Sequence, residues 1–254
     1  MSVAVDDLAR ELHIARLERR PTLPLTDRVD ELDLDAAYAV QAAGLQLRVQ
    51  DGETLIGGKL GFTSRAMQQA MGVDHPNSGW LSDAMLIHDG VVRLDTLIHP
   101  KVEPEIAFLL KRCLIPPVHD ADVLHATRAV IPCLEVVDSR YRDFRFRALD
   151  NIADNSSAGA VVLGDPVRLT ADIDLSLTGC AVRVDGRLRE TAAGAAVLGH
   201  PAAAVAWMAN QASASLCAGH LVISGGMTGP VDLTPGTFVR ADLDRLGSVQ
   251  LRAA

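Results

Sequence analysis

Two glutamates separated by a single residue form the most chemically suggestive pattern in this chain. Glu103 and Glu105 lie in the segment KVEPEIAF (residues 101–108), whose composition otherwise favours a β-strand. Side chains at positions i and i+2 of a strand point to the same face, so the two carboxylates should project together. Adjacent carboxylates repel each other unless a cation or a shared proton lies between them. The spacing therefore indicates either a cation site or a solvated strand face.

A third carboxylate occurs in a similar setting. Glu135 is surrounded in the sequence by the apolar residues Ile131, Cys133, Val136 and Val137, and such neighbours rarely accommodate an unpaired charge. Three carboxylates without a cysteine or histidine cluster favour a hard cation that prefers oxygen ligands, such as Mg²⁺ or Mn²⁺.

Pro104 separates the two glutamates of the first segment. A proline cannot donate to a sheet ladder, so its presence predicts an edge strand or a bulge.

The composition sets limits on the class of protein. The chain has 254 residues, of which 48% are hydrophobic and 22% are charged, which suits one large domain or a domain with a small N-terminal addition. Its formal net charge of −8 argues against a nucleic-acid partner. No run of 18 apolar residues predicts a membrane span, and the acidic N-terminus (Asp6, Asp7) does not resemble a signal peptide.

The four cysteines are widely spaced and form no C-x-x-C motif. They are Cys113, Cys133, Cys180 and Cys217. This pattern predicts reduced thiols in a cytoplasmic protein rather than a disulfide framework.

The first 54 residues are expected to form a helical region. Leu8, Leu12 and Leu17 recur at helical spacing between residues 5 and 19, and prolines at 21 and 24 end that helix. Asp33 or Asp35 can cap a second helix that runs to about residue 49. We expect a β-rich catalytic domain to occupy residues 55–254.

Lys59 lies among glycines at the start of this second region. A short strand over residues 55–62 should be followed by a helix over 65–71, capped by Thr63 or Ser64. The glycines do not fit the spacing of a phosphate-binding P-loop, nor that of a dinucleotide-binding βαβ unit. Glycines beside a strand lysine let a ligand approach closely, although a solvent-facing lysine is the alternative.

The remaining pattern is mostly β. Strands are expected within residues 85–94, 97–110, 131–137, 158–163, 180–188 and 220–224 and in two segments at the C-terminus, with helices over 120–130 and 201–216. Residues 138–157 form a long irregular polar connection, of a kind that is often functional. Because strands and helices do not alternate regularly, the sequence predicts an α+β fold with a rolled or sandwiched sheet.

Several separate motifs, in order along the chain, resemble the hydratase/decarboxylase family, which includes 2-oxopent-4-enoate hydratase and 2-oxo-3-hexenedioate (4-oxalocrotonate) decarboxylase. This group belongs to the fumarylacetoacetate hydrolase superfamily. The motifs are GKLGFTS (58–64), MQQ (67–69), GVD (72–74), PKVEPEIAF (100–108), LEVVDSR (134–140) and ADNSS (153–157).

The resemblance implies a fold, a cofactor and a set of site residues. The fold would be a mixed β-roll core of the fumarylacetoacetate hydrolase C-terminal-domain type, preceded by helices. The cofactor would be Mg²⁺ or Mn²⁺ bound by the three glutamates. The catalytic residues would be Lys59 and Asp74, and the substrate contacts would come from Thr63, Ser64, Ser157 and Arg140.

The family acts on 2-hydroxydienoates or their 2-oxo tautomers, which arise in the meta-cleavage of aromatic compounds. The segment SRYRDFRF (139–146) and the segment SGGMT (224–228) favour a decarboxylase, whereas GVDHP (72–76) and SDAM (82–85) favour a hydratase. Taken together, these four segments predict decarboxylation of 2-oxo-3-hexenedioate to 2-hydroxypenta-2,4-dienoate. The main alternative is hydration of 2-hydroxypenta-2,4-dienoate to 4-hydroxy-2-oxopentanoate.

The resemblance also implies partners. Family members are cytoplasmic homo-oligomers that bind a small 2-oxo acid, and the decarboxylases are often paired with their hydratase. A further alternative is an inactive scaffold subunit, although the presence of Lys59 and all three glutamates argues against it.

Overall fold

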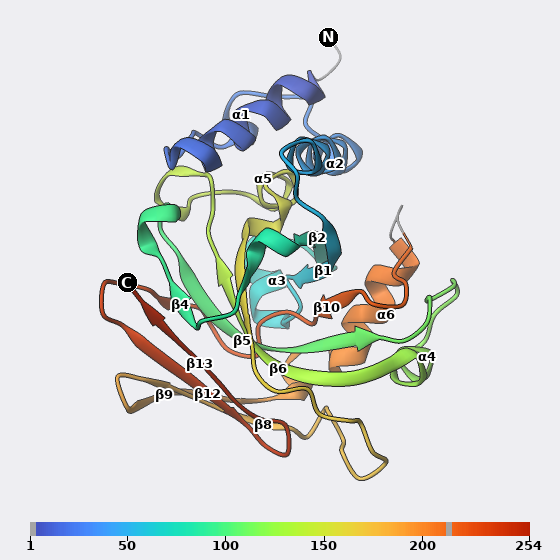
Figure 1. Ribbon diagram of the computed structural model, residues 1–254. Coiled ribbons are helices and arrows are strands. Elements are labelled where there is room, and N and C mark those ends of the chain that lie inside the picture. Colours follow the sequence, from blue (N-terminus) through green and yellow to red (C-terminus); the bar gives the residue numbers. More distant parts are fainter. Residues whose placement is uncertain (1–3, 212–214) are drawn as a thin grey trace.

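Two β-sheets carry most of the chain, and a pair of N-terminal helices lies over one end of them (Figure 1). The computed structural model describes residues 4–211 and 215–254. The helices are α1 (Val5–Glu18), α2 (Leu34–Gln50), α3 (Arg65–Met71), α4 (Asp120–Ala126), α5 (Ala148–Ala153) and α6 (Pro201–Gln211).

The first sheet has eight strands within the described residues, in the order β2-β1-β10-β5-β6-β7-β3, with β11 also paired to β5. It is mixed, because β1 pairs with β10 and β3 with β7 in parallel while the other pairs are antiparallel. Its strands are β1 (Leu55–Gly61), β2 (Asn77–Ser82), β3 (Leu86–Ile87), β5 (Lys101–Leu110), β6 (Thr127–Val137), β7 (Ala158–Leu163), β10 (Leu221–Ile223) and β11 (Val231–Asp232).

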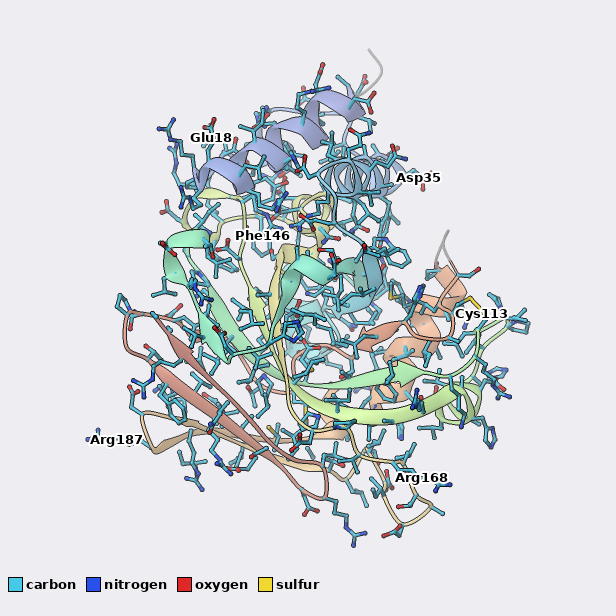
Figure 2. All side chains as sticks on the ribbon, in the orientation of Figure 1. Glu18, Asp35, Cys113, Phe146, Arg168 and Arg187 are labelled. Atoms are coloured by element: carbon cyan, nitrogen blue, oxygen red, sulfur yellow. A yellow bond between two sulfur atoms is a disulfide. The ribbon has the colours of Figure 1, made fainter. Side chains whose placement is uncertain are left out.

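The second sheet packs against the first at β6 and β7. Its order is β4-β13-β12-β8-β9, and its β13 and β12 contact the first sheet. The strands are β4 (Val91–Val92), β8 (Gly179–Val184), β9 (Arg187–Ala193), β12 (Phe238–Leu243) and β13 (Gly247–Ala253). Figure 2 shows two arginines projecting outward, Arg187 at the start of β9 and Arg168 in the loop before β8.

Alternation along β5 separates the core from the site. Val102, Ile106 and Phe108 are at most 1% exposed and belong to the main hydrophobic cluster between the elements. Glu103 and Glu105 lie at the intervening positions and point to the other face. One face of the strand is therefore packed in the core, and the opposite face carries the carboxylates.

The N-terminal helices cover the irregular segment that follows β6. Asp33 caps α2 by accepting a hydrogen bond from the Ala36 amide at 2.8 Å. Leu8 and Leu12 of α1 pack in one buried cluster with Tyr141 of the irregular segment. The helical region is therefore a support for residues 138–157, which reach the site described below.

The fold expected from the sequence is confirmed in class and in most elements. The α+β architecture with a mixed, curled sheet is present, and Ser64 caps α3 as one of the two proposed residues. The helix expected over 120–130 is wrong in extent, because it ends at Ala126 and β6 begins at Thr127. The expected C-terminal half of the helix over 201–216 falls partly on residues outside the described part of the chain.

Pro104 is not on an edge strand, since β5 lies in the middle of the larger sheet. On one side, Pro104 pairs in register with Leu134 of β6. On the other side, β10 pairs only with residues 107–109 and β11 only with residues 101–102. The proline therefore faces a gap between two short strands, where the Met227 amide donates to its carbonyl at 2.9 Å and no ladder hydrogen bond is lost.

The prediction of four reduced cysteines is wrong for one pair. Cys113 and Cys217 form a disulfide between the end of β5 and the segment before β10. Backbone pairing brings these segments together, because the Leu114 amide donates to the Leu216 carbonyl at 2.9 Å. Figure 2 shows Cys113 at the edge of the molecule. Cys133 and Cys180 are buried free thiols.

None of the described helices combines the length and the apolar character needed to cross a membrane.

Candidate metal centre and active-site cavity

Three carboxylates meet where β5 and β6 run side by side. Glu103 pairs directly with Glu135 across the two strands, and Glu105 follows on the same face of β5. One oxygen from each of the three glutamates lies within 4.8 Å of the others. Glu105 and Glu135 are at most 1% exposed, whereas Glu103 is partly exposed. The sheet register thus creates the cluster that the spacing predicted.

Burial and mutual repulsion raise the pKa values of two of these carboxylates. Burial, and then the charge of Glu135, raise the pKa of Glu103 to about 7. The same two causes raise the pKa of Glu105 well above its ordinary value. In the absence of a compensating charge, the site therefore retains protons that ordinary glutamates would lose.

The hydrogen bonds at the cluster leave room for a cation. Glu105 accepts one hydrogen bond, from the Gly225 amide at 2.7 Å, through Oε2. Its Oε1 and both carboxylate oxygens of Glu135 are buried and accept no hydrogen bond from the described residues. Buried carboxylate oxygens normally have partners, and an oxygen-coordinated divalent cation would supply one. The residues therefore fit the metal that the sequence suggests.

Lys59 of β1 reaches the same point from the neighbouring part of the sheet. Its side chain is 3% exposed, and its Nζ lies 3.2 Å from Oε2 of Glu135. The ammonium also donates to the carbonyl oxygen of Ser156 at 2.8 Å and to its Oγ at 3.2 Å. Lys59 is therefore a buried cation beside the carboxylates and not a solvated charge at a strand end.

A strained turn holds the oxygens that receive Lys59. Asn155, Ser156 and Ser157 have φ angles of 51°, 51° and 55°, a left-handed conformation that costs energy for non-glycine residues and is often found at functional sites. Asn155 secures the turn on β2, since its side chain accepts from the Trp80 amide and donates to the Trp80 carbonyl. A Cβ atom on Gly79 would lie 2.5 Å from the Asn155 carbonyl oxygen, so only glycine lets the turn lie this close to the strand.

A cavity of about 310 Å³ opens next to these groups. Its charged lining residues are Lys59, Lys101 and Glu103, and serines of the turn lie beside them. Much of the remaining lining is apolar and consists of Met67, Met71, Phe144, Phe146, Val137 and Pro230. The cavity therefore combines charged groups with apolar side chains. Figure 2 shows Phe146 below the N-terminal helices, toward the interior of the molecule.

Three of the proposed substrate contacts lie at this cavity. Thr63, Ser64 and Ser157 all line it. Thr63 and Ser157 are each 3% exposed, and Ser157 accepts a hydrogen bond from the side-chain amide of Asn151 at 2.9 Å. The structure thus brings these residues together with Lys59 and the glutamates, and their contacts with a substrate remain predictions.

Arg140 does not line the cavity, and this position does not support its assignment as a substrate contact. It is 4% exposed and forms a buried ion pair with Asp154, and its guanidinium also donates to the carbonyls of Asp138, Asp154 and Ala158. These bonds use its donors inside the protein. Arg140 therefore fixes both ends of the segment that carries the strained turn.

Asp74 also lies apart from the cavity. It is exposed in the turn after α3 and does not line the cavity. This position does not support its assignment as a catalytic residue.

Several residues that line the cavity had no role predicted from the sequence. Lys101 belongs to the segment that carries Glu103 and Glu105, and its ammonium lies 2.8 Å from Asp232 and 5.0 Å from the ring centre of Phe144. Asn151 and Ser156 lie within the irregular segment. The length of that segment marked it as functional, but no spacing rule identifies which of its side chains point inward.

The chain belongs to the fumarylacetoacetate hydrolase family, because residues 64–253 match the model of the fumarylacetoacetate hydrolase C-terminal domain. Within that family it falls in the hydratase and 4-oxalocrotonate decarboxylase group of metal-dependent lyases of meta-cleavage catabolism. The fold class expected from the sequence agrees with this membership.

Three relatives define the similarity. A 2-hydroxypent-2,4-dienoate hydratase of Pseudomonas putida is 44% identical over 209 residues, which cover 81% of this chain and 94% of the relative. A 4-oxalocrotonate decarboxylase of Pseudomonas putida is 36% identical over 96% of this chain and 95% of the relative. The solved structure of 4-oxalocrotonate decarboxylase from Pseudomonas putida G7, complexed with magnesium and adipate, superposes with a TM-score of 0.95 at 35% identity, covering 100% of this chain and 98% of that one.

Proposed function

We propose that the protein is a Mg²⁺-dependent hydratase that converts 2-hydroxypenta-2,4-dienoate to 4-hydroxy-2-oxopentanoate. The observation that carries the proposal is a cavity lined both by charged groups, including Lys59 and Glu103, and by apolar side chains such as Met67. The substrate combines the same two kinds of group, since it has a carboxylate and a C2 oxygen at one end and an uncharged alkenyl tail at the other. The hydratase relative at 44% identity supports this choice, which reverses the preference for a decarboxylase drawn from the sequence motifs.

Glu103, Glu105 and Glu135 would hold the Mg²⁺ ion, because their oxygens cluster and the buried oxygens Oε1 of Glu105 and Oε1 and Oε2 of Glu135 accept no hydrogen bond from the described residues. When bound, the ion supplies a Lewis acid for the charge that develops on the C2 oxygen of the substrate. The magnesium in the related decarboxylase structure supports the choice of metal.

The protein side chains would handle binding and protons. Hydration requires the C2 hydroxyl to lose its proton and C5 to gain one. Water then adds across C3 and C4, so that its hydroxyl oxygen bonds to C4, its O–H bond breaks and C3 gains a proton. Lys59 is the buried donor nearest the carboxylates, so we assign it the proton transfer at the charged end of the substrate. Met67, Met71 and Phe144 would enclose the alkenyl tail and exclude bulk water from it.

Decarboxylation of 2-oxo-3-hexenedioate is the second candidate. In that reaction the C5–C6 bond breaks, CO₂ leaves, and the electron pair passes through the C3–C4 double bond to the C2 oxygen. The observation in its favour is Lys101, a cation on the cavity wall that could pair with a second substrate carboxylate. Asp232 already pairs with Lys101 at 2.8 Å, which reduces the charge available to a ligand.

Product analysis with Mg²⁺ and each substrate separately tests the proposal. Formation of 4-hydroxy-2-oxopentanoate from 2-hydroxypenta-2,4-dienoate is expected, whereas CO₂ release from 2-oxo-3-hexenedioate would show the decarboxylase. Lys101→Met should then leave hydratase kinetics almost unchanged but would raise KM for a dicarboxylate substrate. Lys111→Met, at an exposed lysine outside the cavity, is the matched control. Absence of both reactions would favour the scaffold alternative.

The expected assembly and location are part of the same proposal. We expect a cytoplasmic homo-oligomer, and pairing with a partner hydratase or decarboxylase subunit stays a prediction. Sedimentation of the purified protein, alone and co-expressed with a candidate partner, would test both expectations.

A further inference from the structure

A chain of hydrogen bonds connects Lys59 to Ser157 through three other buried side chains. The ammonium of Lys59 lies 3.2 Å from Ser156 Oγ, which donates to Asn77 Oδ1 at 3.0 Å. Asn77 Nδ2 donates to Asn151 Oδ1 at 2.7 Å, and Asn151 Nδ2 donates to Ser157 Oγ at 2.9 Å. All five residues are at most 4% exposed, so bulk water does not compete for these bonds. We call these five residues the relay.

The chemistry of the lysine determines which group donates and which accepts in each hydrogen bond of the relay. An ammonium group has three N–H bonds and accepts no hydrogen bond. Three oxygens surround Lys59 Nζ, namely Oε2 of Glu135 at 3.2 Å and the carbonyl and hydroxyl oxygens of Ser156. Ser156 Oγ is therefore an acceptor toward Lys59, and its own hydrogen is free to donate to Asn77.

The two asparagines transmit this direction along the relay. Because Asn77 accepts through its carbonyl oxygen, its nitrogen must face Asn151. Asn151 in turn accepts through its oxygen and presents its nitrogen to Ser157. An amide has its donor and its acceptor on different atoms, so each asparagine can be reversed only by turning over as a unit.

The relay leaves one hydrogen uncommitted, at its far end. Ser157 Oγ accepts from Asn151, and no acceptor for the Ser157 hydroxyl hydrogen is found among the described residues. Ser157 lines the cavity that also holds Lys59 and Glu103. Its hydrogen can therefore be directed to an oxygen atom of a molecule in that cavity.

We propose that Asn77 and Asn151 are positioning residues that hold the Ser157 hydroxyl as a hydrogen-bond donor to an oxygen of the bound 2-oxo acid. This inference rests on the proposed function for the identity of the ligand. Asn77 does not line the cavity, whereas Asn151 does. Asn77, which lies outside the cavity, would thus control whether the Ser157 hydroxyl donates its hydrogen to a molecule inside the cavity.

Close packing around the relay supports a fixed direction. A Cβ atom on Gly61 would lie 2.3 Å from Asn77 Oδ1 and 2.5 Å from Ser156 Oγ. Glycine at this position lets β1 pass directly beside the hydrogen bond between the two side chains. On the β1 side, the space is therefore too small for a water molecule that could offer either side chain an alternative partner.

Asn77→Asp should reverse the direction of the hydrogen bonds that join residue 77, Asn151 and Ser157, although residue 77 does not contact the ligand. An ionised carboxylate accepts hydrogen bonds but donates none, so Asn151 would turn its nitrogen toward position 77 and its oxygen toward Ser157. The Ser157 hydroxyl would then donate to Asn151 instead of the ligand. The affinity of the Mg²⁺-loaded protein for pyruvate, measured by titration calorimetry, should fall about tenfold, the cost of one hydrogen bond.

A double-mutant cycle with Ser157→Ala distinguishes reversal of the hydrogen bonds from a general effect of the new charge on pyruvate affinity. Ser157→Ala should cause the same loss of pyruvate affinity as Asn77→Asp, and the double variant should lose no more than either alone. Asn151→Asp, which places an acceptor directly beside Ser157, should couple to Ser157→Ala in the same way. Losses that add in both cycles would overturn the relay.

A measurement without ligand distinguishes failure of the relay from failure of the proposed function. In protein with ¹⁵N-labelled asparagine, Ser157→Ala should shift the side-chain amide signals of Asn151 and speed their hydrogen exchange. Asn77→Asp should also shift these signals. Unchanged Asn151 signals in both variants would contradict the relay, whereas the expected shifts without pyruvate binding in the parent protein would contradict the proposed function alone.

Discussion

Glu135 is the residue on which the metal site depends most, because both of its carboxylate oxygens are buried without a hydrogen bond among the described residues. Its apolar neighbours in the sequence, including Val136, are buried as expected. Lys59 contributes one compensating charge at 3.2 Å, whereas Lys101, the other cation that acts on Glu103, is itself paired with Asp232. A divalent ion would offset the remaining charge, since its two positive charges add to that of Lys59.

Glu135→Gln should weaken Mg²⁺ binding at least about tenfold, because loss of an outer partner of a metal ligand already has an effect of that size. Turnover should fall with it, and excess Mg²⁺ should restore part of the activity. Calorimetric titration with Mg²⁺ measures the affinity. Glu190→Gln on the exposed strand β9 is the control and should bind Mg²⁺ normally. Normal binding by Glu135→Gln would exclude Glu135 as a ligand.

Lys59→Ala should reduce kcat by about 10²-fold or more, which is typical of a lost acid or base. Its Mg²⁺ affinity should change much less than that of Glu135→Gln, because lysine is not a ligand in the proposed site. Lys59→Arg should not restore full activity, since guanidinium is broader and stays protonated. Steady-state kinetics and Mg²⁺ titration of the same preparations check this. Near-normal turnover of Lys59→Ala would limit Lys59 to a structural role.

The element that decides the site is the irregular segment between β6 and β7. It provides Asn151, Ser156 and Ser157 to the cavity, and its strained turn carries the oxygens that receive Lys59. The N-terminal helices hold it in place, as Gln41 of α2 donates to the Ile152 carbonyl at 2.8 Å. The predicted helical region (1–54) therefore supports a segment of the predicted catalytic domain (55–254), and the division into these two domains stays a prediction.

Arg140→Met should destabilise the protein by roughly 3–5 kcal/mol, because it leaves the buried carboxylate of Asp154 without its cation. Urea unfolding measures the change. Arg145→Met removes an exposed ion pair with Asp27 and should cost no more than about 1 kcal/mol. If Arg140→Met instead kept its stability and raised KM for the substrate, the original assignment of Arg140 to substrate binding would be correct.

For the molecule as a whole, the carboxylate cluster links the free energy of unfolding to pH and to metal binding. In the metal-free protein the pKa of Glu103 is about 7, compared with an ordinary value near 4.5. Because the folded-state pKa is raised, this group's stabilising contribution is fully present below pH 4.5 and is lost as the pH rises through 7. The loss has an upper limit of about 3 kcal/mol from the shift of this one group.

Without metal, the free energy of unfolding should therefore decrease between pH 6 and pH 8, and saturating Mg²⁺ should remove most of that decrease. Urea unfolding at both pH values, with EDTA and with Mg²⁺, measures the effect. Glu103→Gln cannot ionise at this position and is the matched control, so its pH dependence without metal should be smaller. An equal decrease in the parent and in Glu103→Gln would show that Glu103 is not responsible.

The sequence alone determined the fold class and the metal-site candidates, because both depend on local regularities. Alternation along a strand places Glu103 and Glu105 on one face whatever the sheet around them, and Ser64 caps α3 through contacts within one turn. The family motifs added Lys59 and Ser157 as site candidates, since each lies inside a short segment that resembles a family motif.

Only the tertiary structure decided which distant groups meet. The register between β5 and β6 sets Glu103 opposite Glu135, and packing of the irregular segment on β2 brings Asn151 to Asn77, 74 residues away in the sequence. The same packing directs Arg140 into the protein and leaves Asp74 outside the cavity. A spacing pattern specifies the face of an element, but contacts between elements depend on how the whole chain buries its apolar surface.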